Sequence, residues 1–294
     1  TLRGGGPRGM NRSLAALPAM LALAILAGAY GSFFATGLMH QVPGTANVAG
    51  PPDMANYLRF FRGEGQLPVF LDTFVFSVIV TLATTVLGYP LAYFIARTDS
   101  RFLRVLFLAV LVATFLSGSV TRAYGWMVIL GNRGLLNTLL LNAGLIGEPF
   151  RILYRQLGVG IELVHFILPF FVLTVVGGIR NVPRALEEAS RDLGSGPART
   201  FLRVTLPLSL PAVAEGMALA LALALSAFLF PLMLGGGRVR LVANYIYDQI
   251  FVAFDIPFAA VVSAAFLICS CLALMLMVGL QRWLLRHFAT GGVA

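Results

Sequence analysis

The chain has 294 residues, of which 59% are hydrophobic and only 11% are charged. A soluble globular protein carries about a quarter charged residues, so a purely soluble enzyme or binding domain is excluded. The net charge of +9 comes from arginine alone, at the ends of apolar runs, which argues against nucleic-acid binding. The composition therefore predicts an all-α, polytopic membrane protein with a single domain over residues 1–294.

Six apolar stretches are long enough to cross a bilayer, which takes about 20 mostly apolar residues. They are residues 14–38, 69–96, 105–130, 159–179, 206–234 and 258–280. The first is longer than the roughly 7–15 residues of a signal-peptide core, so we expect a membrane span rather than a cleaved signal. Pro90, Pro169 and Pro231 interrupt three of the stretches, which neighbouring helices can tolerate.

Arginine is unevenly distributed between the two sets of connections. One side carries most of it, at Arg3, Arg8, Arg12, Arg97, Arg101, Arg104, Arg180, Arg184, Arg191, Arg199, Arg203, Arg282 and Arg286. Because positive loops stay inside, this side is expected to be cytoplasmic, with both termini there. The other side holds residues 41–68, 131–156 and 235–255, with short amphipathic helices near 56–61 and 241–254.

The connection at residues 183–207 differs from the other loops. Pro183 suits the first position of a helix, Gly194 suits a left-handed helix end, and Pro197 suits the start of a second helix. An apolar stripe runs along the first helix, and acidic and basic side chains take its other faces. The stripe consists of Ala185, Leu186, Ala189 and Leu193. These features alone allow two interpretations, an ordinary solvated loop or an element that docks into a groove of a partner.

A sequence motif in this loop resembles a known family. Glu188-Ala189-Ser190, Gly194, Val204 and Leu206-Pro207 are similar to the EAA loop of type I ABC importer permeases, with Ser190 for alanine and Val204 for isoleucine. Three further segments resemble the spermidine/putrescine branch of that family. They are Thr121 to Trp126, Gly134 to Asn137, and Phe228 to Pro231 with Gly235-Gly236.

The resemblance implies the fold of type I (MetI-like) importer permeases and a role as the transmembrane subunit, in a bacterial inner membrane. It also implies the partners: two ATPase subunits, a second permease subunit that is a paralogue, and an external solute-binding protein. The loop would couple to the ATPase through Glu187, Glu188, Ala189, Ser190, Asp192, Gly194 and Pro207. The implied solute is a polyamine, although thiamine, iron and phosphonate are alternatives within the family.

Catalysis and cofactors are not expected on this chain. A P-loop needs a lysine for the phosphates, and the sequence contains no lysine, so ATP and Mg²⁺ would bind a partner subunit. The three histidines lie at different depths, which argues against a metal site. Cys269 and Cys271, two positions apart on a helix, point to different faces and would neither bridge nor chelate.

Polar side chains inside apolar stretches are candidates for the translocation path, because an ionisable group there costs about 2.5–3.5 kcal/mol. The candidates are Arg122, Tyr124, Trp126, Glu162, His165 and Glu215. Glu162 and His165 share a helix face, and as a proton relay they would suit an ion-gradient-driven secondary transporter, the alternative function. An interfacial aromatic belt equally explains Tyr124 and Trp126, and a structural hydrogen bond or a position near the surface explains Glu215.

Overall fold

The computed structural model describes residues 12–42, 45, 48–63 and 66–290. Arg3 and Arg8, which enter the predicted topology, lie outside this range. The described helices up to residue 180 are α1 (Arg12–Thr36), α2 (Ala55–Phe61), α3 (Gln66–Arg97), α4 (Arg101–Leu116), α5 (Ser119–Leu130), α6 (Leu135–Asn142) and α7 (Gln156–Arg180). They are followed by α8 (Arg184–Asp192), α9 (Pro197–Thr200), the π-helical turn η1 (Phe201–Thr205), α10 (Leu206–Leu225), α11 (Leu229–Leu234), α12 (Val242–Phe251) and α13 (Ile256–Thr290). Strands β1 (His40–Gln41) and β2 (Val48–Ala49) pair antiparallel.

The helical membrane architecture predicted from composition is confirmed. Five described helices are long and apolar enough to cross a bilayer, and a bent pair of helices makes a sixth candidate. Internal contacts divide the chain into two compact units, residues 1–64 with 246–265 and residues 65–245 with 266–294. Both units have membrane-like composition, so the sequence carries no boundary between them and predicts a single domain.

The first unit is held by polar contacts around α2. Asn56 donates to the carbonyl oxygens of Gly37 (3.1 Å) and Met39 (2.9 Å), at the end of α1. The guanidinium of Arg59 lies 2.6 Å from the Asp255 carboxylate and 4.1 Å from the centre of the Phe258 ring. These contacts fasten the amphipathic segment expected near residues 56–61 to the start of α13.

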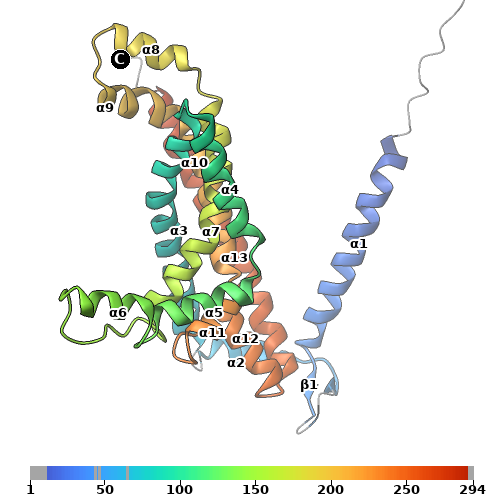
Figure 1. Ribbon diagram of the computed structural model, residues 1–294. Coiled ribbons are helices and arrows are strands. Elements are labelled where there is room, and N and C mark those ends of the chain that lie inside the picture. The colour runs from blue at the N-terminus through green and yellow to red at the C-terminus, as the bar shows by residue number, and fades with distance from the viewer. Residues whose placement is uncertain (1–11, 43–44, 46–47, 64–65, 291–294) are drawn as a thin grey trace, which may run out of the picture. The chain divides into compact units, whose positions relative to one another are not determined.

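The second unit is built on three long helices, α3, α7 and α10, which pack against one another. Small residues bring the backbones close, as is common between helices in a bilayer. A Cβ atom on Gly178 of α7 would lie 2.0 Å from the Cβ of Ala212 in α10, so only glycine fits there. Figure 1 shows α8 and α9 at one end of this unit and α5, α6 and α11 at the other.

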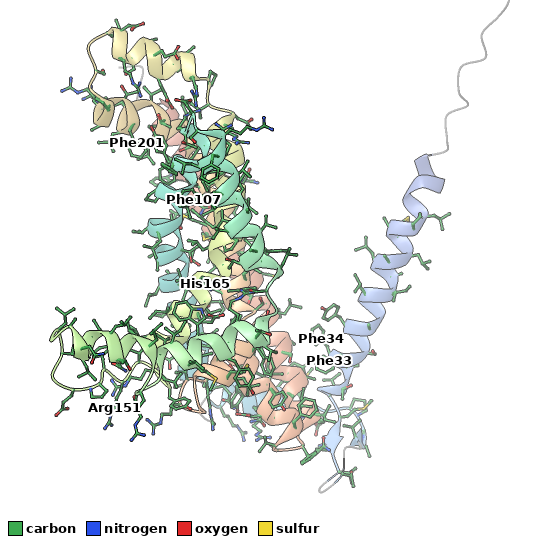
Figure 2. All side chains as sticks on the ribbon, viewed as in Figure 1. Phe33, Phe34, Phe107, Arg151, His165 and Phe201 are labelled. Atoms are coloured by element: carbon green, nitrogen blue, oxygen red, sulfur yellow. The ribbon has the colours of Figure 1, made fainter. Side chains whose placement is uncertain are left out.

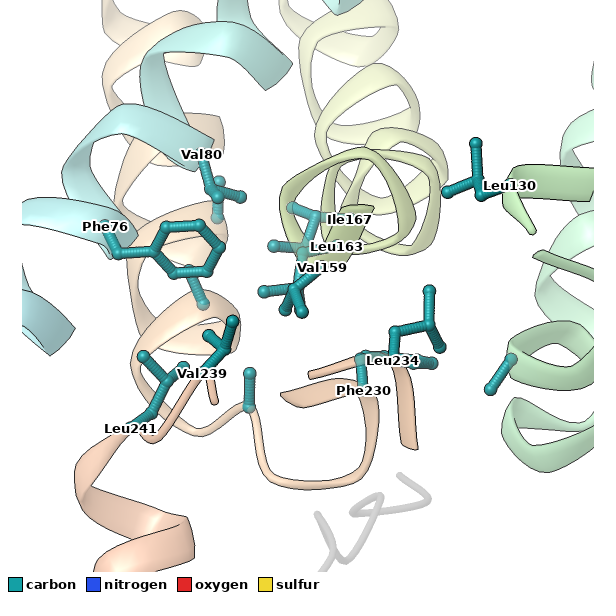
Figure 3. Close-up of a cluster of buried hydrophobic side chains, with 14 of the residues drawn as sticks. Phe76, Val80, Leu130, Val159, Leu163, Ile167, Phe230, Leu234, Val239 and Leu241 are labelled. Atoms are coloured by element: carbon teal, nitrogen blue, oxygen red, sulfur yellow. The ribbon is translucent and has the colours of Figure 1, made fainter. Parts of the chain in front are cut away.

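The apolar core of the second unit continues toward the α5 and α11 end. Figure 3 shows side chains from α3 (Phe76, Val80), α7 (Val159, Leu163, Ile167) and α11 (Phe230, Leu234) in one buried cluster. The predicted span 206–234 is wrong at its end, because α10 stops at Leu225 and α11 is a separate short helix. Hydrophobicity alone does not detect this break, since α11 is as apolar as the helix before it.

The predicted span 105–130 is not one straight helix. Helix α4 ends at Leu116, and the segment that begins with α5 is bent from it by 102°. Ser117 and Gly118 have extended backbone, with ψ of 130° and 138°. The Arg122 Nη2 donates to the Ser117 carbonyl (2.7 Å), and the guanidinium thereby caps the C-terminal end of α4. A capped end makes the break stable inside an apolar stretch.

Candidate functional site

Helices α8 and α9 and the turn between them, residues 184–200, form an elbow between α7 and α10. As the sequence predicts, Gly194 is left-handed (φ 85°), and a second helix starts at Pro197. The Gly194 N–H donates to the Arg191 carbonyl (2.8 Å), which closes the end of α8. The Ser190 and Thr200 hydroxyls are 3.2 Å apart and join α8 to α9.

The apolar stripe of α8 faces outward. Leu186 is 46% exposed and Leu193 is 88% exposed, and Ala185 and Ala189 are exposed as well. Burying an apolar side chain of this size is worth about 1.5–3 kcal/mol. The elbow therefore presents an apolar strip that another surface would stabilise by covering it.

The sequence places Glu187 among the charged side chains on the other faces of the first elbow helix, but the structure buries it. It is only 6% exposed, and its Oε1 accepts from Arg97 Nε (2.9 Å) and from the Thr205 hydroxyl (2.8 Å). Arg97 Nη2 lies 2.7 Å from the same carboxylate and donates to the Val182 carbonyl (3.0 Å). We call the three side chains Arg97, Glu187 and Thr205 the latch. Three such donor contacts offset the free energy that the Glu187 carboxylate loses when it is removed from water.

A second ion pair lies next to the latch but is open to solvent. Arg184 Nη1 lies 2.7 Å from Asp99 Oδ1, and Arg184 Nη2 donates to the Arg97 carbonyl (3.0 Å). The hydrogen bond from Arg184, supported by its positive charge, holds the pKa of Asp99 below its ordinary value. Because the Asp99 side chain is 86% exposed, this pair adds little to stability.

Three of the predicted path residues meet between α5 and α7, and Figure 2 marks the place by His165. The indole N–H of Trp126 donates to His165 Nδ1 (3.2 Å), and Glu162 Oε2 lies 3.9 Å from the same nitrogen. Because Nδ1 accepts from the indole, it has no proton to offer the carboxylate. Glu162 is fully buried, and neither of its oxygens has a hydrogen-bond partner among the described residues.

Arg122 lies close to this group but has local partners of its own. Its Nε donates to the Ser117 hydroxyl (3.2 Å), and its guanidinium carbon is 5.3 Å from the centre of the Phe166 ring. A cavity of about 300 Å³ opens beside it, lined by Arg122, Phe166, Phe115 and Phe170. We call Arg122, Trp126, Glu162 and His165 the polar cluster.

The remaining path candidates lie apart from the polar cluster. Tyr124 is 58% exposed on α5. Glu215 lines a different cavity of about 270 Å³, with Gln281 and Arg282 of α13. The sequence-based set is therefore divided among at least two places in the second unit.

Residues 67–289 match the family described as binding-protein-dependent transport system inner membrane component. The chain belongs to this family. Among curated relatives, the spermidine/putrescine transport system permease protein PotB of Haemophilus influenzae is 33% identical, over 75% of this chain and 76% of the relative. PotB of Escherichia coli is 36% identical, over 66% of this chain and 70% of the relative.

Solved structures of bacterial importers share the fold of this inner membrane component. A chain of a bacterial ABC transporter involved in import of the acidic polysaccharide alginate superposes with a TM-score of 0.66. The match has 16% identity and covers 90% of this chain and 94% of that one. A chain of the methionine transporter MetNI matches with a TM-score of 0.52, 15% identity, and coverage of 76% and 97%. The fold is thus that of ABC importer permeases, as predicted.

The sequence predicts the elbow but not the latch that holds it in place. Arg97 counts only among the arginines that indicate the cytoplasmic side, and no role is predicted for Thr205. An arginine at the last residue of an apolar span and a glutamate in a short amphipathic helix carry no motif that links them. The only hint is the chemistry, since a buried carboxylate needs a cationic partner.

Proposed function

We propose that this chain is the permease subunit of an ATP-driven importer of polyamines such as spermidine and putrescine. Its identity of 33–36% to spermidine/putrescine permeases, over 66–75% of the chain, carries the proposal. The family description supplies the general class, an inner membrane component that depends on a binding protein.

The elbow is proposed to be the site where an ATPase subunit docks. Its exposed leucines and its small residues at 185 and 189 allow a close apolar contact with a partner groove. The coupling residues are Glu187, Glu188, Ala189, Ser190, Asp192, Gly194 and Pro207, of which Glu187 acts from inside the elbow. ATP and Mg²⁺ would bind the ATPase, and no catalytic step is assigned to this chain.

The complete transporter is proposed to hold two ATPase subunits, a second permease subunit of related sequence and an external solute-binding protein. The arginine-rich connections support an elbow and termini on the cytoplasmic side of the inner membrane. Cysteine labelling at Ser195, in a chain with Cys269 and Cys271 replaced by alanine, tests this orientation. Labelling by an impermeant reagent added outside intact cells would contradict it.

The polar cluster, Tyr124 and Glu215 are proposed to lie along the translocation path. Carboxylates and aromatic faces suit the ammonium groups of a polyamine. Arg122 keeps its positive charge, but Ser117 and the Phe166 ring hold its guanidinium at the C-terminal end of α4, where the negative end of the helix dipole partly offsets that charge.

The test is reconstitution of the chain with its ATPase, second permease and binding protein in liposomes. We expect uptake of labelled spermidine that depends on internal ATP and competes with putrescine. ATP-dependent uptake of thiamine, iron or a phosphonate in place of spermidine would overturn the polyamine assignment but keep the permease class. Purification of the chain without any P-loop ATPase would overturn the class.

A matched pair of substitutions tests the docking surface. Leu193→Arg, on the elbow, should abolish co-purification of the ATPase. Leu145→Arg is the control, because Leu145 is similarly exposed (71%) but follows α6 at the other end of the unit. Equal loss of the ATPase in both variants, or in neither, would contradict the docking role.

A further inference from the structure

The latch joins parts of the second unit that are far apart in sequence. The elbow continues covalently into α7 on one side and through η1 into α10 on the other. Helix α3 is not covalently adjacent to the elbow, since Arg97 at its end and Glu187 in α8 are 90 positions apart in the sequence. Movement of the elbow can therefore reach α3 only through non-covalent contacts. Of the polar contacts at this corner, the latch is buried and the Arg184–Asp99 pair is exposed.

The latch also contacts the entrance to α10. Thr205 is fully buried and is the last residue of the π-helical turn, and its hydroxyl reaches the same Oε1 atom as Arg97. π-helical turns are rare in proteins, and those that occur are often at functional sites. One carboxylate oxygen thus lies where α3, α8 and the start of α10 meet.

A structural role alone does not explain why an ion pair is used here. Replacing a buried ion pair by well-packed apolar side chains is often neutral or stabilising. Ion pairs of fixed geometry do have one property that apolar contacts lack, since they favour a single alignment of the segments they join. That property is useful where segments must move together.

We propose that Glu187 is a positioning residue that makes the end of α3 and the entrance of α10 move with the elbow during the transport cycle. This inference rests on the proposed function, in which an ATPase grips the elbow. Helices α3, α7 and α10 form the packed centre of the unit, so displacement of α3 with the elbow would change the membrane part of the permease. Glu188, the next residue, is exposed on the surface of the elbow and is not part of the latch.

The experiment measures whether α3 and the elbow move together in the reconstituted complex. Spin labels are placed at Phe94 on α3 and Ala198 on α9, both exposed, and their distance is recorded without nucleotide and with trapped ATP. With the wild-type latch, we expect the same distance between the two labels without nucleotide and with trapped ATP. In Glu187→Gln we expect the distance to change between states, and spermidine moved per ATP hydrolysed to fall about five- to tenfold.

Thr205 provides a second, milder pair of variants in case Glu187→Gln does not assemble. Thr205→Val keeps the shape of the side chain but removes the hydroxyl donor, whereas Thr205→Ser keeps the donor. We expect Thr205→Val to lower the transport-to-ATP ratio and Thr205→Ser to retain it. Asp99→Asn is the control for the exposed neighbouring pair and should keep both the distance and the ratio.

The inference is overturned if the label distance already changes with ATP in the wild-type chain. It is also overturned if neither Glu187→Gln nor Thr205→Val alters the distance or the ratio. These outcomes differ from failure of the proposed function, in which the wild-type complex itself would neither hydrolyse ATP on binding of the spermidine-loaded binding protein nor take up spermidine.

Discussion

Two buried glutamates of the same unit have opposite surroundings. Glu187 has three donor contacts to one oxygen, from Arg97 and Thr205, while Glu162 has none among the described residues. Both carboxylates have lost their water, which costs several kcal/mol for an unpaired charge. The comparison separates two kinds of buried acid: Glu187 is satisfied and joins helices, whereas Glu162 is unsatisfied and is the one proposed to lie along the translocation path.

The largest expected effect is on stability at the latch. Arg97→Met would leave the Glu187 carboxylate buried without its cation, at a cost of about 3–5 kcal/mol. The double variant Arg97→Met/Glu187→Leu removes both charges and should recover most of this loss. Thermal unfolding of the purified complex in nanodiscs measures both. Similar melting temperatures for the single variant and the wild type would show that the pair is not effectively buried in the assembly.

Glu162→Gln should give the converse result. Because the carboxylate has no hydrogen-bond partner among the described residues, removing its charge should leave the melting temperature equal or higher. Spermidine uptake should fall about tenfold, which corresponds to about 1.4 kcal/mol of lost interaction with an ammonium group. Transport by proteoliposomes is compared with the melting temperature of the same preparation.

Two outcomes would undo the contrast between the glutamates. A strong loss of stability in Glu162→Gln would mean that Glu162 has a structural partner, for example in the second permease subunit. Unchanged uptake with unchanged stability would remove Glu162 from the path. His165→Gln is a matched comparison, because it disturbs the Trp126 contact but leaves the carboxylate in place.

Gly194 tests the shape of the elbow separately from its charges. Its φ of 85° disfavours any side chain, and a Cβ there would meet nothing within 4 Å, so Gly194→Ala changes the backbone preference alone. The cost is about 1–2 kcal/mol, which should weaken the turn and lower binding-protein-stimulated ATP turnover. Gly196→Ala is the control, with equally open space but a φ of −67° that alanine accepts. Equal ATP turnover in the two variants would contradict a role for the left-handed turn.

The sequence predicts well what depends on local chemistry and poorly what depends on distant contacts. Apolar length revealed the long helices, and glycine and proline marked both helices of the elbow. The break after Leu116 was missed because the apolar run continues through it and its stabilising contact comes from Arg122. The latch was missed because no periodicity connects α3 with α8. The position of Glu162 in an apolar stretch makes it a path candidate, but only the three-dimensional structure shows that no described residue donates a hydrogen bond to it.

The smallest expected effect is the change in melting temperature when the exposed Arg184–Asp99 pair beside the latch is removed. Asp99→Asn removes a carboxylate that Arg184 contacts at 2.7 Å but that solvent reaches freely. Because the folded-state pKa of Asp99 is lowered, the pair contributes above the ordinary aspartate pKa and loses its contribution as pH falls through the lowered value. The melting temperatures of Asp99→Asn and wild type should therefore differ slightly and by a constant amount from pH 6 to pH 8. A difference that grew within this range would mean that another group titrates with the pair, and a difference as large as that of Arg97→Met would mean that burial does not distinguish the two ion pairs.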